Sequence, residues 1–313
     1  MKHIENMNKP RRVAVSWPLV GCLMLGAGAV PAQDPSELPG TLVFAATVDG
    51  NWDLFSWQGD RRPQLARLTE TPYDEKSPAL SNDRKLLAFA TSAGELAVLD
   101  LERGTSRVLD LGDYPGHWDF PSFSADSRAL VCTYFEGDAR DRARLVILDL
   151  ETENVRFPLA QPGPQVSPAW SPDGGAIVYA YGHCSDACGA IIQEPWLVSL
   201  ATGKARQLLM TGAHTGGFAW DAAGERIGFV SDQSGGFDIW LLRREADELT
   251  RVTDHPGFDG SPTFSPGGGQ LAFISNRSGT SKIWIRDEDS GSVELFDPLG
   301  SEGNAAYKDV DWK

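Results

Sequence analysis

The side chains best suited to chemistry in this chain are its histidines, two closely spaced cysteines and its many carboxylates. Four histidines follow the first 32 residues: His117, His183, His214 and His255. None stands in a His-Glu-x-x-His arrangement, and the sequence holds no Gly-x-Ser-x-Gly elbow and no phosphate-binding glycine loop. We therefore expect no catalytic residues, and an enzyme with an acidic site is the alternative.

The two cysteines lie in the segment 181–189, which lengthens one predicted hairpin. In an oxidising compartment, two cysteines four residues apart in a glycine-containing loop most simply form a disulfide, so we predict a bond between Cys184 and Cys188. A metal site that also uses His183 and Asp186 is the alternative. Cys132, in an apolar run, is expected to be buried and inert.

A second cation site could be assembled from His117, Asp119 and His214, whose side chains are of types that bind divalent metals. These residues are far apart in the sequence, and only the fold could bring them together. We predict that the protein needs no cofactor, with a divalent cation in a central channel as the alternative.

The elements that would position these residues are copies of one sequence unit. The fullest copy is Ser167-Pro168-Ala169-Trp170-Ser171, which runs on into Pro-Asp-Gly at 172–174. The proline position of the unit recurs at residues 78, 121, 168, 217, 262 and 310, with Gly217 in place of proline in the fourth copy. Steps of 43 to 49 residues are typical of four-stranded propeller blades.

The two ends of the chain complement each other. Residues 41–69 hold three predicted strands with no opening strand before them, whereas residues 309–313 supply an opening strand with nothing after it. We predict that the C-terminal strand completes the N-terminal blade, which leaves no exposed sheet edge at the junction. The predicted fold is an all-β, six-bladed propeller of four-stranded antiparallel blades over residues 41–313.

One apolar position recurs in every unit, and we predict that it packs between neighbouring blades. Its occupants are Leu80, Phe123, Trp170, Trp220, Phe264 and Trp312.

These motifs resemble a known repeat. Pro-Ala-Trp-Ser-Pro-Asp-Gly at 168–174, the strands that follow it, Ser-Asp-x-x-Gly and Asp-Ile-Trp are similar to the WD-like β-propeller repeat of the TolB type, over about residues 41–313. The resemblance implies a non-catalytic propeller that binds a protein or peptide of the cell envelope or the extracellular space. We expect no counterpart of the TolB N-terminal α/β domain, and no hydrolase domain of the prolyl-oligopeptidase type.

The first 32 residues are predicted to be a secretory signal peptide, because four basic residues precede a mostly apolar stretch that ends in Val30-Pro31-Ala32. Residues 33–40 would then be a linker, and the protein periplasmic or secreted. Lipid attachment at Cys22, after Leu-Val-Gly, is the alternative. Pro18 interrupts the apolar stretch, so we predict no transmembrane span.

The charge balance is acidic, with 28 Lys and Arg against 43 Asp and Glu and a formal net charge of −15. The predicted signal peptide carries four of the basic residues and one acid, so the remainder is more acidic still. Such a surface argues against nucleic acid or anionic lipid as a partner. We expect a monomer.

A binding surface is predicted where the connection between blades borders the channel. The residues three positions before the aligned prolines would form a ring there, and they are Glu75, Trp118, Gln165, His214, Asp259 and Tyr307. Acidic residues at this position could instead cap strand backbone. Trp118, His214 and Tyr307 depart from the repeat and are the stronger candidates for contacts with a partner.

The alternative function is a small, metal-assisted glycan-processing enzyme, either a polysaccharide lyase or a hydrolase, with an acidic site in the same channel mouth. Two carboxylates roughly 5 to 10 Å apart could serve as acid and base. Some propellers of related repeat type are metal-dependent polysaccharide lyases.

Overall fold

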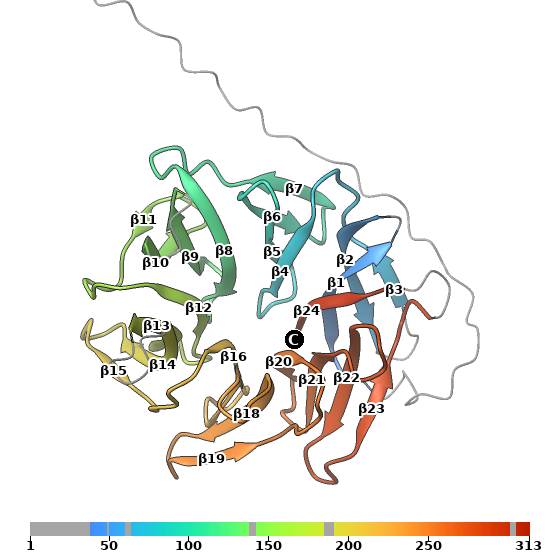
Figure 1. The fold of residues 1–313 in the computed structure, drawn as a ribbon. Helices are drawn as coiled ribbons and strands as arrows, with labels where there is room; N and C mark the ends of the chain where they lie inside the picture. The colour runs from blue at the N-terminus through green and yellow to red at the C-terminus, as the bar shows by residue number, and fades with distance from the viewer. Residues whose placement is uncertain (1–37, 49, 60–63, 138–141, 185–190, 301–304) are drawn as a thin grey trace, which may run out of the picture.

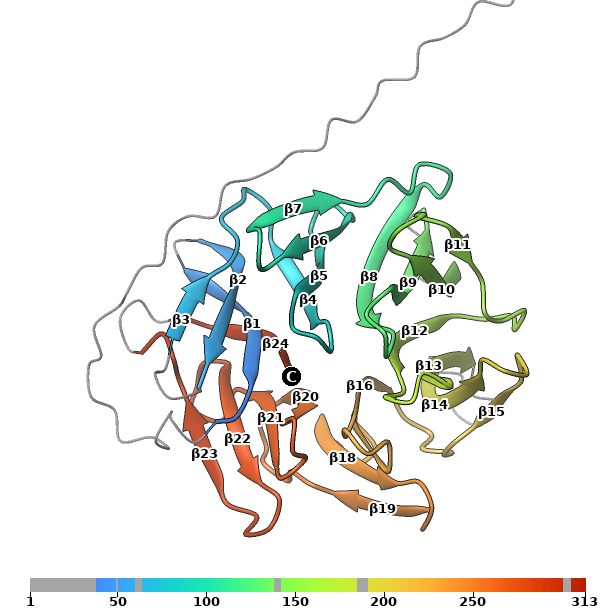
Figure 2. The ribbon, with the colours of Figure 1, turned by 180° about the vertical axis from the view of Figure 1, so that it is seen from behind.

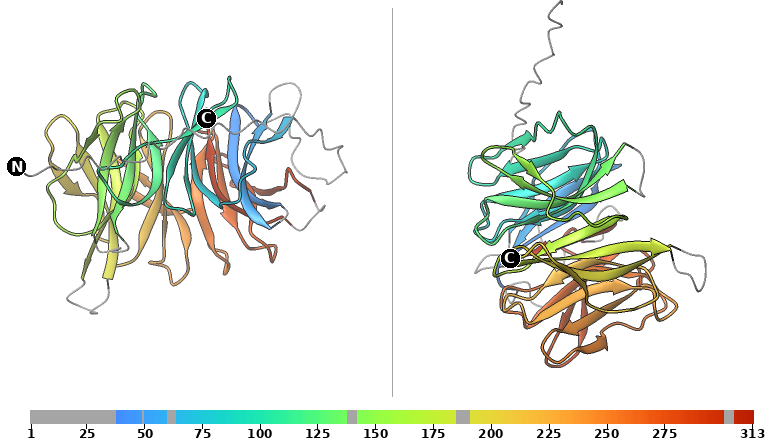
Figure 3. Two further views of the ribbon diagram at one scale, coloured as in Figure 1. Left: turned by 90° about the horizontal axis from the view of Figure 1, so that it is seen from above. Right: turned by 90° about the vertical axis from the view of Figure 1, so that its left-hand side faces the viewer.

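The chain folds into six antiparallel sheets of four strands, arranged as blades around a central channel (Figure 1). The computed structural model describes residues 38–48, 50–59, 64–137, 142–184, 191–300 and 305–313. The same ring is seen from behind in Figure 2. Viewed from the side, the strands lie across the thickness of a disc (Figure 3). The predicted six-bladed propeller is confirmed.

The innermost strand of every blade borders the channel. These strands are β4 (Glu75–Leu80), β8 (Gly116–Phe123), β12 (Gln165–Trp170), β16 (Thr215–Trp220), β20 (Asp259–Phe264) and β24 (Tyr307–Trp312). The second strands are β1 (Thr41–Val48), β5 (Leu86–Thr91), β9 (Ala129–Glu136), β13 (Ala176–Cys184), β17 (Arg226–Ser231) and β21 (Gln270–Ser275).

The third and fourth strands complete each blade toward the rim. The third strands are β2 (Asn51–Gln58), β6 (Leu96–Asp100), β10 (Ala143–Asp149), β14 (Ile191–Ser199), β18 (Asp238–Arg243) and β22 (Lys282–Asp287). The fourth are β3 (Gln64–Arg67), β7 (Thr105–Val108), β11 (Val155–Arg156), β15 (Ala205–Gln207), β19 (Glu248–Arg251) and β23 (Val293–Phe296). Blade 1 consists of β24 and β1–β3, and blades 2 to 6 follow in chain order.

The ring is closed by pairing the two ends of the chain. Strand β24 is antiparallel to β1, with Trp312 opposite Leu42, and the backbone N–H of Thr41 donates to the carbonyl of Lys313 at 2.7 Å. The blue and red ends of the ribbon therefore lie side by side in blade 1 (Figure 1). This is the closure that the sequence predicts.

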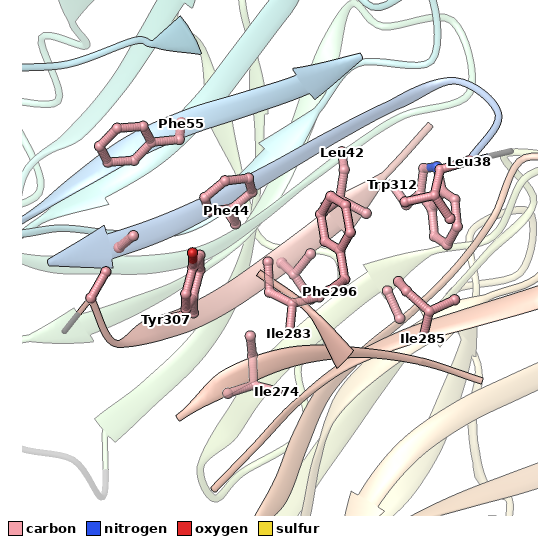
Figure 4. Close-up of a cluster of buried hydrophobic side chains, with 14 residues drawn as sticks. Leu38, Leu42, Phe44, Phe55, Ile274, Ile283, Ile285, Phe296, Tyr307 and Trp312 are labelled. Atoms are coloured by element: carbon pink, nitrogen blue, oxygen red, sulfur yellow. The ribbon is translucent and has the colours of Figure 1, made fainter. Parts of the chain in front are cut away.

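The hydrophobic core is divided into six clusters, one at each interface between neighbouring blades. At the closing interface, Trp312, Phe44 and Tyr307 of blade 1 lie with isoleucines of blade 6 (Figure 4). All six occupants of the recurrent apolar position belong to these clusters, as predicted. Burial of apolar surface between blades therefore stabilises the ring as a whole.

Each innermost strand contains one residue in the left-handed backbone region, at φ of 48° to 58°. These residues are Ser77, Phe120, Ser167, Gly217, Ser261 and Asp309. At each of them the register with the second strand shifts, which is the mark of a β-bulge.

The bulge corrects one detail of the sequence alignment. Gly217 occupies the left-handed position, and Phe218 stands where the other copies have proline or Val310. The alignment of Gly217 with proline was therefore wrong by one residue. The preference of glycine for the left-handed region is the signal that would have placed it correctly.

The Ser-x-Asp turn after the innermost strand has a structural role. In blade 4 the Ser171 hydroxyl donates to Asp173 and accepts the N–H of Ala176 at 2.9 Å, while Asp173 accepts the N–H of Gly175 at 2.9 Å. These side chains satisfy backbone groups that the turn leaves outside the sheet.

Three predictions fall wholly or partly outside the described residues: the signal peptide with its Cys22 alternative, the linker at residues 33–40, and the Cys184–Cys188 disulfide with its metal alternative. Cys132 is buried and free, as predicted, and burial raises the pKa of its thiol. Within the ranges described above, no helix is long and apolar enough to cross a membrane.

Candidate functional site

The end of the propeller at which the innermost strands begin is called here the mouth face. Because the strands alternate in direction, this face carries the connections from each fourth strand to the next blade and the hairpins between second and third strands. All six residues of the predicted binding ring lie at this end. The fold therefore brings them to one face, although from six different blades.

Five of the six ring residues are buried rather than exposed to the channel. Glu75, Trp118, Gln165, Asp259 and Tyr307 are at most 4% exposed. Their observed contacts are with the connections at this face, with the preceding blade or with the second strand of their own blade. A ligand in the channel would reach these side chains only through their neighbours, and their role in binding stays a prediction.

Glu75 is a buried carboxylate at the interface of blades 1 and 2. It accepts hydrogen bonds from the hydroxyls of Thr69, at 2.9 Å, and Thr71. Burial raises its pKa to about 7, and the nearby charge of Asp53 adds to this rise while the two hydroxyls oppose it. Asp53 itself accepts from Arg67, and burial raises the pKa of Asp53 as well.

Gln165 bonds to strand backbone, whereas the carboxylate of Asp259 bonds to an arginine side chain. The Gln165 side chain accepts the N–H of Leu145 at 3.2 Å, on the third strand of the preceding blade. Both oxygens of Asp259 accept from the Arg277 guanidinium at 3.0 Å. Both bonds come from one guanidinium nitrogen, Nη2, and a charge-assisted pair of this kind holds the buried carboxylate in place.

Trp118 and Tyr307 are packing residues in their observed contacts. Trp118 lies against Tyr134, with ring centroids 4.8 Å apart. The Tyr307 ring lies 5.4 Å from that of Phe44 (Figure 4), and its hydroxyl donates to Asp297 and accepts the N–H of Leu299 at 3.0 Å. Burial and the neighbouring carboxylate raise the pKa of Tyr307.

His214 differs from the other ring residues because its side chain is 49% exposed. Its Nδ1 lies 3.2 Å from Oδ2 of Asp232, on the connection that follows β17. The structural equivalent of Glu75 and Tyr307 in blade 5 is instead Thr215, whose hydroxyl donates to the carbonyl of Gln193 at 2.8 Å. This shift follows from the one-residue correction at Gly217.

The next position along each strand turns to the opposite side of the strand, at the channel edge. Its occupants are Lys76, Asp119, Val166, Gly216, Gly260 and Lys308. Only Asp119 was singled out from the sequence. The two lysines could have been noticed because blades 4, 5 and 6 have small or apolar residues at this position. That comparison is possible only if one already knows which strand positions face the channel.

Four residues form a charged mouth cluster: Lys76, Asp119, Lys308 and Asp309. Lys76 pairs with Asp119 of the following blade, and Asp119 also accepts from the Ser77 hydroxyl at 2.8 Å. Asp309 accepts the N–H of Ser77 at 2.9 Å. Burial raises the pKa of Asp309 and lowers that of Lys308.

A cavity of about 500 Å³ opens beside this cluster, between the innermost strands of blades 2, 3 and 4. Lys76, His117, Asp119 and Phe120 contribute to its wall. Phe120 is 37% exposed, although it is one of the six residues at the left-handed bulge position. The other blades place serine, glycine or aspartate there, so an aromatic side chain at this point is a departure from the repeat.

Exposed large apolar side chains of the described residues all belong to the mouth face or the adjoining channel wall. They are Tyr73, Phe120, Met210, Phe237 and Phe258. Phe237 and Phe258 contact each other edge to face, with ring centroids 5.9 Å apart. The Phe258 ring also lies over Gly260, where an added Cβ would meet it at 2.4 Å.

The described residues contain no group of three or more His, Cys, Asp or Glu side chains that could hold a metal ion. His117 lies over Gly94, whose added Cβ would meet its Nδ1 at 2.1 Å, while His214 lies beside Asp232. The strands they adjoin, β8 and β16, belong to blades 3 and 5, with blade 4 between them. The cation alternative therefore stays a prediction.

Comparison with curated proteins finds relatives that share part of the chain. The Tol-Pal system protein TolB of Francisella tularensis subsp. mediasiatica is 26% identical over 104 residues. The match covers 33% of this chain and 23% of that protein, so the chain corresponds to about a quarter of the relative's length.

Solved structures share the fold at low identity. TolB from Acinetobacter baumannii superposes with a TM-score of 0.71 at 19% identity, over 87% of this chain and 66% of that one. An oligogalacturonate lyase from Vibrio parahaemolyticus gives a TM-score of 0.56 at 17% identity, over 82% of this chain and 74% of that one. The family model of the TolB beta propeller domain matches residues 136–308, more than half of the chain. The chain therefore belongs to the TolB β-propeller domain family.

Proposed function

We propose that this protein is an exported, monomeric propeller that binds a protein or peptide partner at its mouth face. Phe120 is the observation that carries the proposal. A bulky side chain in the left-handed region costs about 1–2 kcal/mol, and such strain tends to persist at functional sites. Here the strained residue is Phe120, whose partly exposed ring lines a cavity of about 500 Å³.

The surrounding surface supports the same conclusion. Exposed aromatic side chains are enriched in the cores of protein interfaces, and the large exposed rings of the described residues gather on one face. The relatives named as Tol-Pal system proteins favour a partner in the cell envelope. Export, in the periplasm or beyond the cell, rests on the predicted signal peptide at residues 1–32.

The substitution Phe120→Ser tests the proposal, because serine is the residue that three other blades use at this position. It removes the ring and leaves a side chain that three blades accommodate at the same backbone conformation, so we expect the unfolding free energy to change by less than about 1 kcal/mol. Retention of the partner from a cell-envelope extract on the immobilised protein should fall about tenfold or more.

Met210→Ser is the matched control, because Met210 is 85% exposed on the same face but lies on an outer connection. Its retention should stay close to that of the unchanged protein. Equal retention by the unchanged protein and Phe120→Ser would show that the cavity is not where the partner binds.

A glycan-processing enzyme is less well supported. The likeness to an oligogalacturonate lyase is at 17% identity and concerns the fold alone. The described side chains also supply no cluster of potential metal ligands. Turnover of a uronic-acid polymer by purified protein, lost on treatment with a chelator, would nevertheless favour the enzyme over the binding protein.

A further inference from the structure

Lys308 is a partly buried cation of the mouth face that forms no ion pair with the described residues. It is the second residue of β24, and its Nζ lies 4.3 Å from the centre of the Trp52 ring. The Trp52 backbone is held in turn, because its N–H donates to Oδ1 of Asp74 at 3.1 Å. Cation–π contact of this kind attracts an ammonium group without neutralising it.

Other partly covered cations at this end of the propeller are paired. Carboxylates lie within 4 Å of Arg67, Lys76, Arg277 and Lys282. No carboxylate of the described residues lies within 4 Å of the Lys308 ammonium. Burial lowers the pKa of Lys308, as expected where lost hydration is not replaced by a counter-charge.

The charged groups that face Lys308 are already engaged. They are Asp309, Asp74, Lys76 and Asp119. Asp309 accepts from Ser77, Asp74 accepts from Trp52, and Asp119 is paired with Lys76. These carboxylates are therefore directed to protein donors rather than to the Lys308 ammonium.

Exposed aromatic residues also occur in the connections that lead to the two neighbouring innermost strands. Strand β24 lies between β20 and β4, and Phe258 and Tyr73 closely precede those two strands. Phe258 is 43% exposed and Tyr73 is 42% exposed. A group that approaches Lys308 from solvent can contact an apolar surface at the same time, because the Trp52 ring beside Nζ is only partly buried.

We infer that Lys308 binds a carboxylate of the partner, so that the recognised segment carries an acidic group next to an apolar side chain. The inference rests on the proposed function and specifies the chemistry of its ligand. A carboxylate would supply the counter-charge that Lys308 lacks, and a charge-assisted hydrogen bond is stronger than a neutral one. The carboxylate could belong to an Asp or Glu side chain or to a chain terminus.

The test uses peptides selected on the purified full chain from a random display library. The strongest binders are synthesised as C-terminal amides, as free acids, and with each Asp or Glu changed to the corresponding amide. Affinities are measured by fluorescence anisotropy for the unchanged protein, for Lys308→Met, and for the control Lys204→Met. Lys204 is exposed on a hairpin at the opposite face.

We expect the affinity of the selected peptides to depend on one carboxylate, either in a side chain or at the C-terminus. Its removal should weaken binding to the unchanged protein and to Lys204→Met by about tenfold or more. Lys308→Met should bind the unchanged peptide more weakly by the same factor. Removing the peptide carboxylate should then reduce the affinity of Lys308→Met little further, as expected when the two groups are partners in one interaction. Comparison of the amide and free-acid forms distinguishes the two sources of the carboxylate.

A second measurement does not depend on a variant. The pKa of Lys308, followed by the ¹³Cε resonance of the unchanged protein, should rise when an acidic peptide binds. Selection of neutral or basic peptides, an equal carboxylate effect in Lys308→Met, or an unmoved pKa would each overturn the inference. If Phe120→Ser abolishes peptide binding while Lys308→Met preserves it, the proposed function stands and this inference alone fails.

Discussion

Neutralising Glu75 by substitution should stabilise the protein at neutral and alkaline pH. The stabilisation should be much smaller in acid. The carboxyl group is fully buried, and its pKa rises from 4.5 to about 7 on folding. The folded state therefore holds a proton that the unfolded state releases between these values. Because the folded state binds more protons, this group lowers the free energy of unfolding as pH rises through that window.

The size of the effect follows from the two pKa values. Each unit corresponds to about 1.4 kcal/mol, so ionised Glu75 costs the folded state about 3 kcal/mol above pH 8. About 2.5 kcal/mol of this cost develops between pH 5 and pH 8. In Glu75→Gln the amide oxygen can still accept from Thr69. Its NH₂ group then takes the place of the oxygen that accepts from Thr71, whose hydroxyl can accept a hydrogen bond instead of donating one.

Urea unfolding, followed by tryptophan fluorescence at pH 5 and pH 8, gives the required free energies. The difference between Glu75→Gln and the unchanged protein should grow by about 2 kcal/mol in favour of the variant from pH 5 to pH 8. Titrations of other groups cancel in this difference. Glu151→Gln, at an exposed position, should show no such growth. A difference for Glu75→Gln that is equal at both pH values would refute the reasoning.

Three further substitutions probe the mouth face and the closure of the ring. Gly260→Ala should displace the Phe258 ring, which an added Cβ would meet at 2.4 Å, and weaken peptide binding about as much as Phe258→Ala in the same anisotropy assay. Tyr307→Phe removes the hydroxyl that donates to Asp297 and should cost about 1–2 kcal/mol in urea unfolding, with no change in peptide affinity. Trp312→Ala empties a site that is 2% exposed at the closing interface and should cost about 3–5 kcal/mol, seen as a lower thermal midpoint. Unchanged affinity in the first variant, altered affinity in the second, or an unchanged midpoint in the third would contradict the respective assignment.

The architecture could be predicted from the sequence because the unit that encodes one blade occurs six times. The period near 45 residues, the opening strand at residues 309–313 and the recurrent apolar position each find their place in the ring. The predictions hold because strand pairing and burial between blades depend on residue type and spacing, which the sequence contains. A single irregular copy, at Gly217, was enough to shift one alignment by a residue.

The binding site was harder to predict because it depends on which face of a strand a side chain occupies. Glu75 and Lys76 are neighbours in the sequence, yet Glu75 is buried against blade 1 and Lys76 reaches Asp119 in blade 3. The bulge at Ser77 breaks the simple alternation between the proline position and the start of the strand. Counting back from the proline therefore selected the buried face.

A channel built from six similar blades has a wall that is not symmetric. The position that reaches the channel edge is charged in blades 1, 2 and 3, as Lys308, Lys76 and Asp119, whereas blades 4, 5 and 6 have a valine and two glycines there. The cavity beside Phe120 lies toward the charged half as well. Since these three charged positions are adjacent around the ring, a partner that uses them must bind off the channel axis. Substitutions in blades 1 to 3 should then alter affinity more than equivalent ones in blades 4 and 5, a polarity that binding along the axis would not produce.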